Sequence, residues 1–147
     1  MPLTNLPDAD HIVRYVPWTK VEKDADDNVL GVLAVAYQRR EGEEALSVNW
    51  LERVGVVDEL TALRETLSFM QSTLNVGKKG RLAISNVADF KGICAKREQR
   101  VRIIHAPVDG NEPHSEVRQI PREDLQLLEE IASAAVKYHL SCGELMG

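Results

Sequence analysis

The stretch RLAISNVADFKGIC, residues 81–94, indicates the fold class because it joins a strand directly to a helix. Residues 81–84 are mostly apolar and predict a short strand. Ser85 or Asn86 then suits a helix N-cap, and Asp89 follows Asn86 at the spacing of a capping box. The apolar residues that follow recur at helical spacing and are expected to face a core: Val87, Phe90, Ile93 and Cys94. A strand that passes at once into an amphipathic helix predicts helices packed on a sheet.

Other short runs, rich in β-branched or apolar residues, predict the remaining strands. They occupy residues 12–16, 29–38, 45–49 and 101–105, and residues 115–120 pair back on the last of these. Pro17 ends the first run, which is typical of a strand at the edge of a sheet. The second run is also compatible with a buried helix, but its valines favour a strand.

Two further segments have the apolar spacing of helices. Between residues 57 and 71 the inward positions are Leu60, Leu63, Leu67 and Met70. The last helix is expected to begin at Pro121 and to end before Gly143. Its apolar stripe consists of Leu125, Leu128, Ile131, Ala132, Ala135 and Val136. We therefore predict an α+β fold: a single mixed β-sheet of about five strands, with two long and one shorter helix packed mainly on one face.

The length of 147 residues supports one domain with a core of its own. Residues 1–10 contain prolines, Asp and Asn among few apolar residues, and we expect an irregular arm there. Residues 11–140 form the single α+β domain, and residues 141–147 form a C-terminal tail. A composition of 44% hydrophobic and 28% charged residues excludes a disordered chain.

Several absences predict a cytoplasmic protein with no membrane contact. The two cysteines, Cys94 and Cys142, form no Cys-x-x-Cys pair and are expected to be free thiols in a reducing compartment. The N-terminus carries neither a basic nor an apolar segment of the kind found in signal peptides. The longest apolar run, residues 29–37, is far shorter than the roughly 20 residues that cross a bilayer.

The formal net charge of −5 excludes a polycationic nucleic-acid binder but leaves room for a local basic patch. The negative charge is concentrated before residue 60, whereas residues 77–102 are net positive. This segment includes Lys78 and Lys79 between two glycines, although the peptide does not match a P-loop. It is a candidate site for nucleic acid or a nucleotide, or else a solvated surface.

The most specific polar cluster surrounds the loop that follows residues 101–105. If the segments on either side of this loop form a hairpin, His105 and His114 would face each other across its mouth. Two imidazoles in that position could act as acid and base in phosphodiester cleavage. The competing interpretation is a solvated loop whose histidines bind backbone groups. The histidines could also ligate a metal with Asp109 or Glu116. No standard metal-ligand spacing is present, however, so we predict neither a metal nor a cofactor.

Further candidate binding residues lie near the ends of predicted strands, where sites collect. Arg14 could hold a phosphate bidentately, and Trp50 could stack on a base. The alternatives are a surface arginine and a tryptophan that anchors a helix to the sheet. The complete set of candidate substrate-binding residues is Arg14, Asn49, Trp50, Asn111, Lys78 and Lys79.

Three segments, VRYVPW at 13–18, LSVNWLE at 46–52, and His105 with Asn111-x-x-His114, resemble a set of small uncharacterised bacterial proteins. The resemblance extends over nearly the full chain. It implies a bacterial origin and carries over no catalytic residue, because no activity is established for that set.

Two hypotheses about function follow. The first is a partner-binding component of a multi-gene system, of the toxin–antitoxin or defence type, acting with a partner protein or as a homo-oligomer. The alternative is a small phosphodiesterase or RNase-type enzyme that uses His105 and His114 as acid and base with a basic phosphate-binding patch. Convergence of the histidines with Arg14 and Asn49 on one pocket would favour the enzyme. An exposed apolar patch would favour the partner-binding component.

Overall fold

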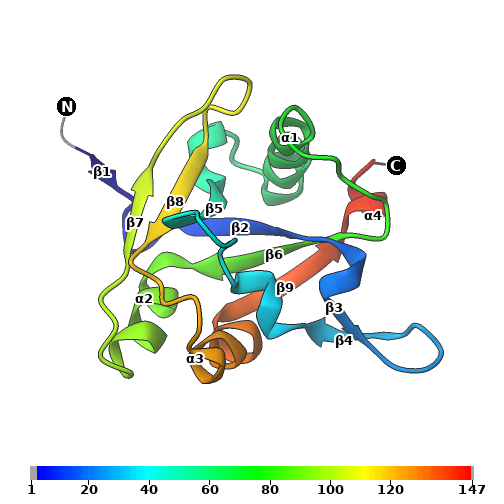
Figure 1. Cartoon of the computed structure of the whole chain (residues 1–147). Coiled ribbons are helices and arrows are strands. Elements are labelled where there is room, and N and C mark those ends of the chain that lie inside the picture. Colours follow the sequence, from blue (N-terminus) through cyan, green and yellow to red (C-terminus); the bar gives the residue numbers. More distant parts are fainter. Residues whose placement is uncertain (1–2, 147) are drawn as a thin grey trace.

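The computed structural model describes residues 3–146, which fold around a seven-stranded sheet with antiparallel pairing throughout (Figure 1). In spatial order the strands are β1 (Thr4–Asn5), β7 (Arg102–His105), β8 (His114–Arg118), β5 (Ala45–Trp50), β2 (His11–Val16), β6 (Arg81–Asn86) and β9 (Val136–Ser141). A separate two-stranded sheet pairs β3 (Val21–Lys23) with β4 (Val29–Val32). The α+β class is confirmed, whereas the prediction of a single mixed sheet of about five strands is wrong.

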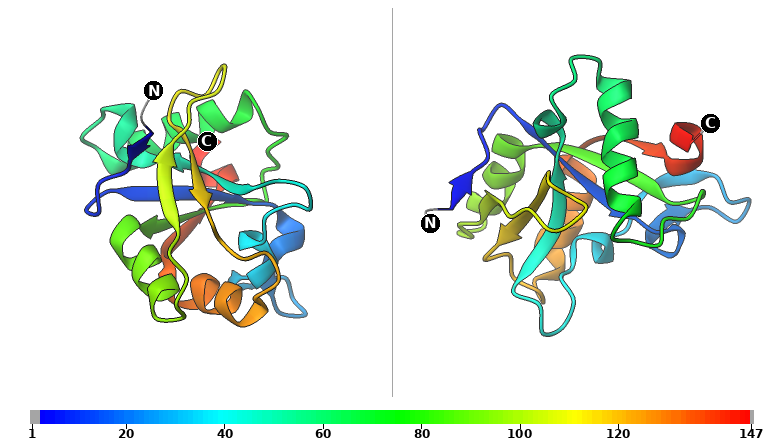
Figure 2. Two further views of the ribbon diagram at one scale, coloured as in Figure 1. Left: turned by 60° about the vertical axis from the view of Figure 1, so that its left-hand side comes forward. Right: turned by 90° about the horizontal axis from the view of Figure 1, so that it is seen from above.

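Helices cover both faces of the large sheet, and not mainly one face as predicted. The α-helices are α1 (Glu59–Gln71), α2 (Val87–Ala95), α3 (Leu125–Glu130) and α4 (Cys142–Met146). Short turns are η1 (Trp18–Lys20), η2 (Ala34–Tyr37), η3 (Leu51–Val54) and the π-helical η4 (Ile131–Ala135). Figure 2 shows α1 and α4 on one side of the sheet and α2 and α3 on the other, with β7 and β8 crossing steeply over β2.

The central strands explain why both faces are covered. In β2, Ile12 belongs to the core under α2 and α3, whereas its neighbour Val13 belongs to the core under α1 and α4. In β6, Ala83 belongs to the core under α2 and α3, whereas its neighbour Leu82 belongs to the core under α1 and α4. Successive side chains of a strand point to opposite faces, so a strand that is apolar at both positions needs a cover on each side.

The quoted stretch folds as predicted. The side chain of Asn86 caps α2 by accepting a hydrogen bond from the Asp89 amide at 3.0 Å. Phe90 is fully buried, and its ring centre lies 6.0 Å from that of Tyr37. In α1 the predicted inward residues Leu63, Leu67 and Met70 are buried, whereas Leu60 is exposed.

Two predictions about individual strands are corrected by the structure. β2 is central, between β5 and β6, because Pro17 lies just beyond the strand and removes no hydrogen bond from it. Residues 29–38 do not form one strand. The chain leaves β4 after Val32 and turns through η2, which places Ala36 and Tyr37 in the core.

The last predicted helix is shorter at both ends. α3 begins at Leu125, where Asp124 accepts a hydrogen bond from the Leu127 amide at 3.1 Å. Residues 136–141 form β9, which pairs with β6. Without β9, the buried strand β6 would leave a row of backbone groups unpaired, and this requirement outweighs the helical spacing of the apolar residues.

Both termini are more regular than expected. The predicted irregular arm contains β1, whose Thr4 lies opposite His105 of β7. The predicted tail contains α4, and Cys142 at its start is fully buried, while residues 1, 2 and 147 lie outside the described part of the chain. Cys94 and Cys142 are free thiols, and burial raises the pKa of each to about 11. None of the helices within residues 3–146 has the length and apolar character needed to cross a membrane.

His139 on β9 makes the stability of the fold sensitive to pH. Arg81 Nε donates a hydrogen bond to His139 Nδ1 at 2.7 Å, which requires that this nitrogen carry no proton. Burial, and then the Arg81 cation, lower the pKa of His139 below its ordinary value of 6.5. The unfolded chain therefore takes up a proton at a higher pH than the folded protein, so stability is lost as the pH falls toward the folded-state pKa.

We expect His139→Gln to lose less stability than the wild type between about pH 7 and about pH 5, because glutamine still accepts from Arg81 without titrating. Urea unfolding at a series of pH values measures this difference. Parallel pH profiles for the two proteins would contradict the assignment.

Candidate functional site

A cavity opens where β2 and β5 separate. The two strands pair only at Ile12–Trp50 and Val13–Asn49, although β2 stays paired with β6 along its whole length. Arg14 reaches into the gap. Its Nε donates to the Ala36 carbonyl and its Nη1 to the Ser47 carbonyl, both at 2.8 Å. The guanidinium thus supplies hydrogen bonds where the strand pairing ends.

We call this space the Arg14 cavity; its volume is about 470 Å³, within the usual range for small-molecule sites. Its walls come from β2, η1, β5, the turn after η2, the C-terminal end of α1 and the β7–β8 loop. The charged residues that line it are Arg14, Lys20, Arg39, Arg40 and Glu43. Four cations against one carboxylate make the cavity electropositive within a protein of net charge −5.

The cations of the cavity act on one another. Burial lowers the pKa of Arg14; Tyr37 and Glu43 oppose this effect, and the neighbouring Arg40 cation adds to it. The pKa of Lys20 is lowered by burial and then by Arg14 and Arg40. Among residues 3–146, no carboxylate forms an ion pair with any of the four cations. Glu43 offsets part of the positive charge at Arg14, and the remaining excess of cations favours the entry of an anion.

Two predicted binding residues, Asn49 and Asn111, form a reciprocal amide pair in the wall of this cavity. Asn49 Nδ2 donates to Asn111 Oδ1 at 2.8 Å, and Asn111 Nδ2 donates to Asn49 Oδ1 at 3.1 Å. Both residues are 2% exposed. The pair fastens the β7–β8 loop to β5, so these asparagines position the wall of the cavity.

His114 also lines the Arg14 cavity. Its Nδ1 lies 2.7 Å from the carbonyl oxygen of Ala106. A carbonyl can only accept a hydrogen bond, so Nδ1 carries the proton, and Nε2 of the neutral ring keeps its lone pair. His114 can therefore accept a hydrogen bond from a ligand.

His105 lies outside the cavity. It is opposite Ser115 in the β7–β8 pairing, so its side chain and that of His114 point to opposite faces of the sheet. Its Nε2 donates to the Glu112 carbonyl at 2.8 Å, and its ring packs edge-on against Trp50 at 5.4 Å. The structure does not bring the two histidines together across the loop.

The remaining predicted residues are spread over other surfaces. Trp50 Nε1 donates to Asp10 Oδ2 at 2.8 Å, which ties the N-terminal arm to β5. Lys78 and Lys79 lie in the loop before β6, and Lys79 Nζ is 5.6 Å from the ring centre of Trp18. Arg81 begins β6, whereas Lys91 in α2 and Lys96, Arg97 and Arg100 after it follow the other end of that strand. This segment is therefore not one continuous patch.

Two other observations concern catalysis and metals. His11 Nδ1 lies 2.6 Å from Glu52 Oε2, away from the Arg14 cavity. Within residues 3–146 there is no group of three or more His, Cys, Asp or Glu side chains that could hold a metal ion.

Sequence reasoning missed Lys20, Arg39 and Arg40, which supply most of the charge of the cavity. The adjacent Arg39 and Arg40 precede an acidic turn at residues 41–44, and such a pair reads as an ordinary solvated turn. Only the folded chain shows that these cations meet Arg14 from β2.

Comparison of the chain with protein-family models, with curated proteins and with solved structures finds no match.

Proposed function

We propose that the protein binds a phosphate-bearing ligand in the Arg14 cavity. The observation that carries the proposal is the meeting of Arg14, Lys20 and Arg40 in one cavity, where no carboxylate of residues 3–146 forms an ion pair with them. Arginine has five N–H donors, and carbonyl oxygens occupy two of those of Arg14. The planar guanidinium is well suited to phosphate oxygens.

The arrangement favours a group with more than one negative charge. The cations come from three separate elements around the cavity, so a phosphate or pyrophosphate can contact several of them at once. His114 and Thr73 also line the cavity, and the His114 Nε2 lone pair and the Thr73 hydroxyl oxygen can accept hydrogen bonds from hydroxyl groups of an attached sugar or alcohol. The proposal is restricted to binding, because His105, the second histidine of the phosphodiesterase hypothesis, is not at the cavity.

Pyrophosphate is the simplest probe of this proposal. We expect calorimetry at low salt to detect pyrophosphate binding to the wild type. The double variant Lys20→Gln/Arg40→Gln should bind about tenfold more weakly or worse, because each lost cation removes a charge-assisted hydrogen bond. Among residues 3–146 the side chains of Lys20 and Arg40 form no ion pair, and the backbone hydrogen bond from Lys20 to Pro17 is kept in the variant, which is therefore expected to stay folded.

Lys78→Gln/Arg100→Gln is the matched control, because it removes the same charge from exposed positions outside the cavity. This control should bind pyrophosphate with nearly the wild-type affinity. Equal weakening in both double variants would indicate a general charge effect, and the proposal would then be abandoned. It would also fail if the wild type bound no pyrophosphate.

A further inference from the structure

The Arg14 cavity has two ends of different chemistry. Ala45 and Asn49 of β5 both line it, and because a strand rises about 3.3 Å per residue, they lie about 13 Å apart along the strand. Arg40 closely precedes Ala45 in the chain, and its charge acts on Lys20. We call this part of the cavity, where the cations meet, the cationic end.

Leu74 and Val108 supply apolar surface at the other end, which we call the apolar end. Each of these side chains is 43% exposed. Leu74 follows α1 and Val108 belongs to the β7–β8 loop, and the Ser72 hydroxyl fastens the two segments together by donating to the Gly110 carbonyl at 2.7 Å. The amide pair described above fastens the same loop to β5 at Asn49. A ligand that covers both side chains removes apolar surface from water, which favours binding.

Tyr15 adds an aromatic wall to the cavity. Its hydroxyl accepts a hydrogen bond from the Gly77 amide at 3.1 Å. Gly80 lies so close to the ring that a Cβ atom added there would be 2.7 Å from Tyr15 Cε1. The loop before β6 therefore holds the ring in place. A ring that is already fixed can pack on a flat ligand group with little further loss of side-chain freedom.

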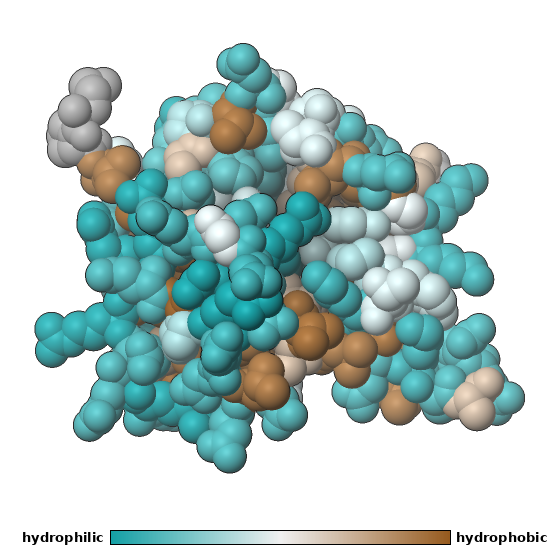
Figure 3. All heavy atoms as spheres, viewed as in Figure 1, coloured by the Kyte–Doolittle hydropathy of each residue, from teal (hydrophilic) through white to brown (hydrophobic). Residues whose placement is uncertain are grey.

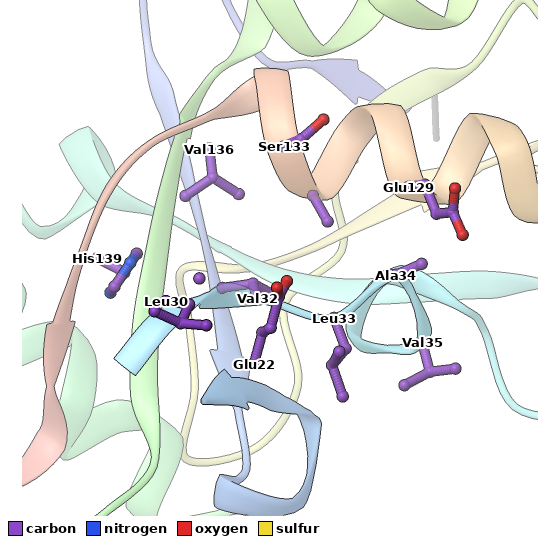
Figure 4. A pocket seen from close by; sticks show the side chains of 12 residues that line it. Glu22, Leu30, Val32, Leu33, Ala34, Val35, Glu129, Ser133, Val136 and His139 are labelled. Carbon is purple, nitrogen blue, oxygen red and sulfur yellow. The ribbon is translucent and has the colours of Figure 1, made fainter. Parts of the chain in front are cut away.

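A second hollow, of about 730 Å³, lacks this combination of cations and apolar surface (Figure 4). It lies between β4 and η2 on one side and η4 and β9 on the other, where apolar side chains gather on the surface in Figure 3. Among residues 3–146, no lysine or arginine lines it, whereas Glu22 and Glu129 do. These carboxylates disfavour an anion, so the second hollow does not compete for a phosphorylated ligand.

We propose that the ligand of the Arg14 cavity is a free nucleoside 5′-phosphate, an inference that rests on the function proposed above. The phosphates bind at the cationic end, and the base packs on Tyr15, Leu74 and Val108. Every nucleobase has a flat face that can stack on an aromatic ring. The His114 Nε2 lone pair can accept a hydrogen bond from a ribose hydroxyl.

The charge distribution favours a free nucleotide over the end of a nucleic-acid strand. The net charge of the chain is −5, and the basic residues of 77–102 are divided between the two ends of β6. A strand that entered the cavity would therefore find no continuous basic surface among residues 3–146 for its further phosphates.

The test compares adenosine 5′-diphosphate with pyrophosphate, which carries the same two phosphate groups without the nucleoside. We expect calorimetry in buffer without divalent cations to show that the wild type binds the nucleotide about tenfold more tightly than pyrophosphate. Leu74→Ser/Val108→Ser should lower the affinity for the nucleotide about tenfold and leave the affinity for pyrophosphate unchanged. Retained pyrophosphate binding also shows that this variant is folded.

Val57→Ser/Leu125→Ser is the matched control, because it removes one valine and one leucine from exposed positions outside the cavity. This control should bind both probes as the wild type does. If the wild type binds the two probes equally, the nucleotide inference is overturned while phosphate binding stands. If it binds neither probe, both proposals fail. Equal weakening of both probes in Leu74→Ser/Val108→Ser would also overturn the inference.

A 5′-phosphorylated tetranucleotide tests the choice of a free nucleotide. We expect the wild type to bind it no more tightly than adenosine 5′-diphosphate, because the additional phosphates lie beyond the cations of the cavity. Clearly tighter binding of the tetranucleotide would assign the cavity to the end of a nucleic-acid strand and overturn the inference.

Discussion

Replacing Phe90 with alanine is expected to lower the free energy of unfolding by about 3–5 kcal/mol. The ring is fully buried and fastens α2 to the sheet beside Tyr37. Removing it takes away apolar burial and leaves a cavity that the rigid strands around it cannot fill. The midpoint of thermal unfolding should fall by about 10 °C for a domain of this size. Urea titration followed by tryptophan fluorescence measures the free energy directly.

The chain offers a matched control, because it contains only one other phenylalanine. Phe69 on α1 is only half-buried. Phe69→Ala removes the same atoms and should cost clearly less, about 1 kcal/mol. If the two substitutions cost the same, Phe90 would not have the central packing role described above.

The amide pair between Asn49 and Asn111 is expected to show strong coupling in a double-mutant cycle. Asn49→Leu or Asn111→Leu alone leaves a buried amide without its partner, at a cost of about 1–3 kcal/mol. The double variant leaves no orphaned amide, so its loss should be smaller than the sum of the two single losses by about 1 kcal/mol or more. Urea unfolding of the four proteins gives the coupling energy.

A neighbouring pair on the same loop provides the comparison. Arg53 and Glu112 form a bidentate ion pair, with 2.8 Å between Arg53 Nη2 and Glu112 Oε1, but both side chains are about half exposed. Their coupling should be smaller than that of the amides, because water competes for both charges. Additive losses in the amide cycle would show that Asn49 and Asn111 act independently.

Local chemistry explains which parts of the fold could be predicted. Asn86, with Asp89 three residues later, specifies the start of α2 through a contact within one turn of chain. The secondary structure of residues 136–141 depends instead on β6, which is distant in the sequence and needs a pairing partner on its free edge. Their apolar spacing continues that of α3, so the pattern alone favours a helix. Tertiary pairing decides the structure in such cases.

The same distinction applies to the candidate site. The sequence predicts site residues from their polar character near strand ends, and four of them line one cavity: Arg14, Asn49, Asn111 and His114. His105 satisfied the same criterion, yet the β7–β8 register turns its ring to the other face. A shift of one residue in register would reverse this outcome, and no feature of the loop sequence specifies the register.

The order of the strands has a consequence for how the chain reaches this fold. β2 leaves the ribosome before β5 and β6, the two strands that complete its pairing on either side. β1 stays unpaired until β7 has been synthesised, and β9, the last of the described strands, closes the far edge. Pairings of such long sequence separation place folding in the slow range of about milliseconds to seconds. During synthesis the apolar β2 must remain unpaired until residue 86 has emerged, and the nascent chain is most prone to aggregation in that interval.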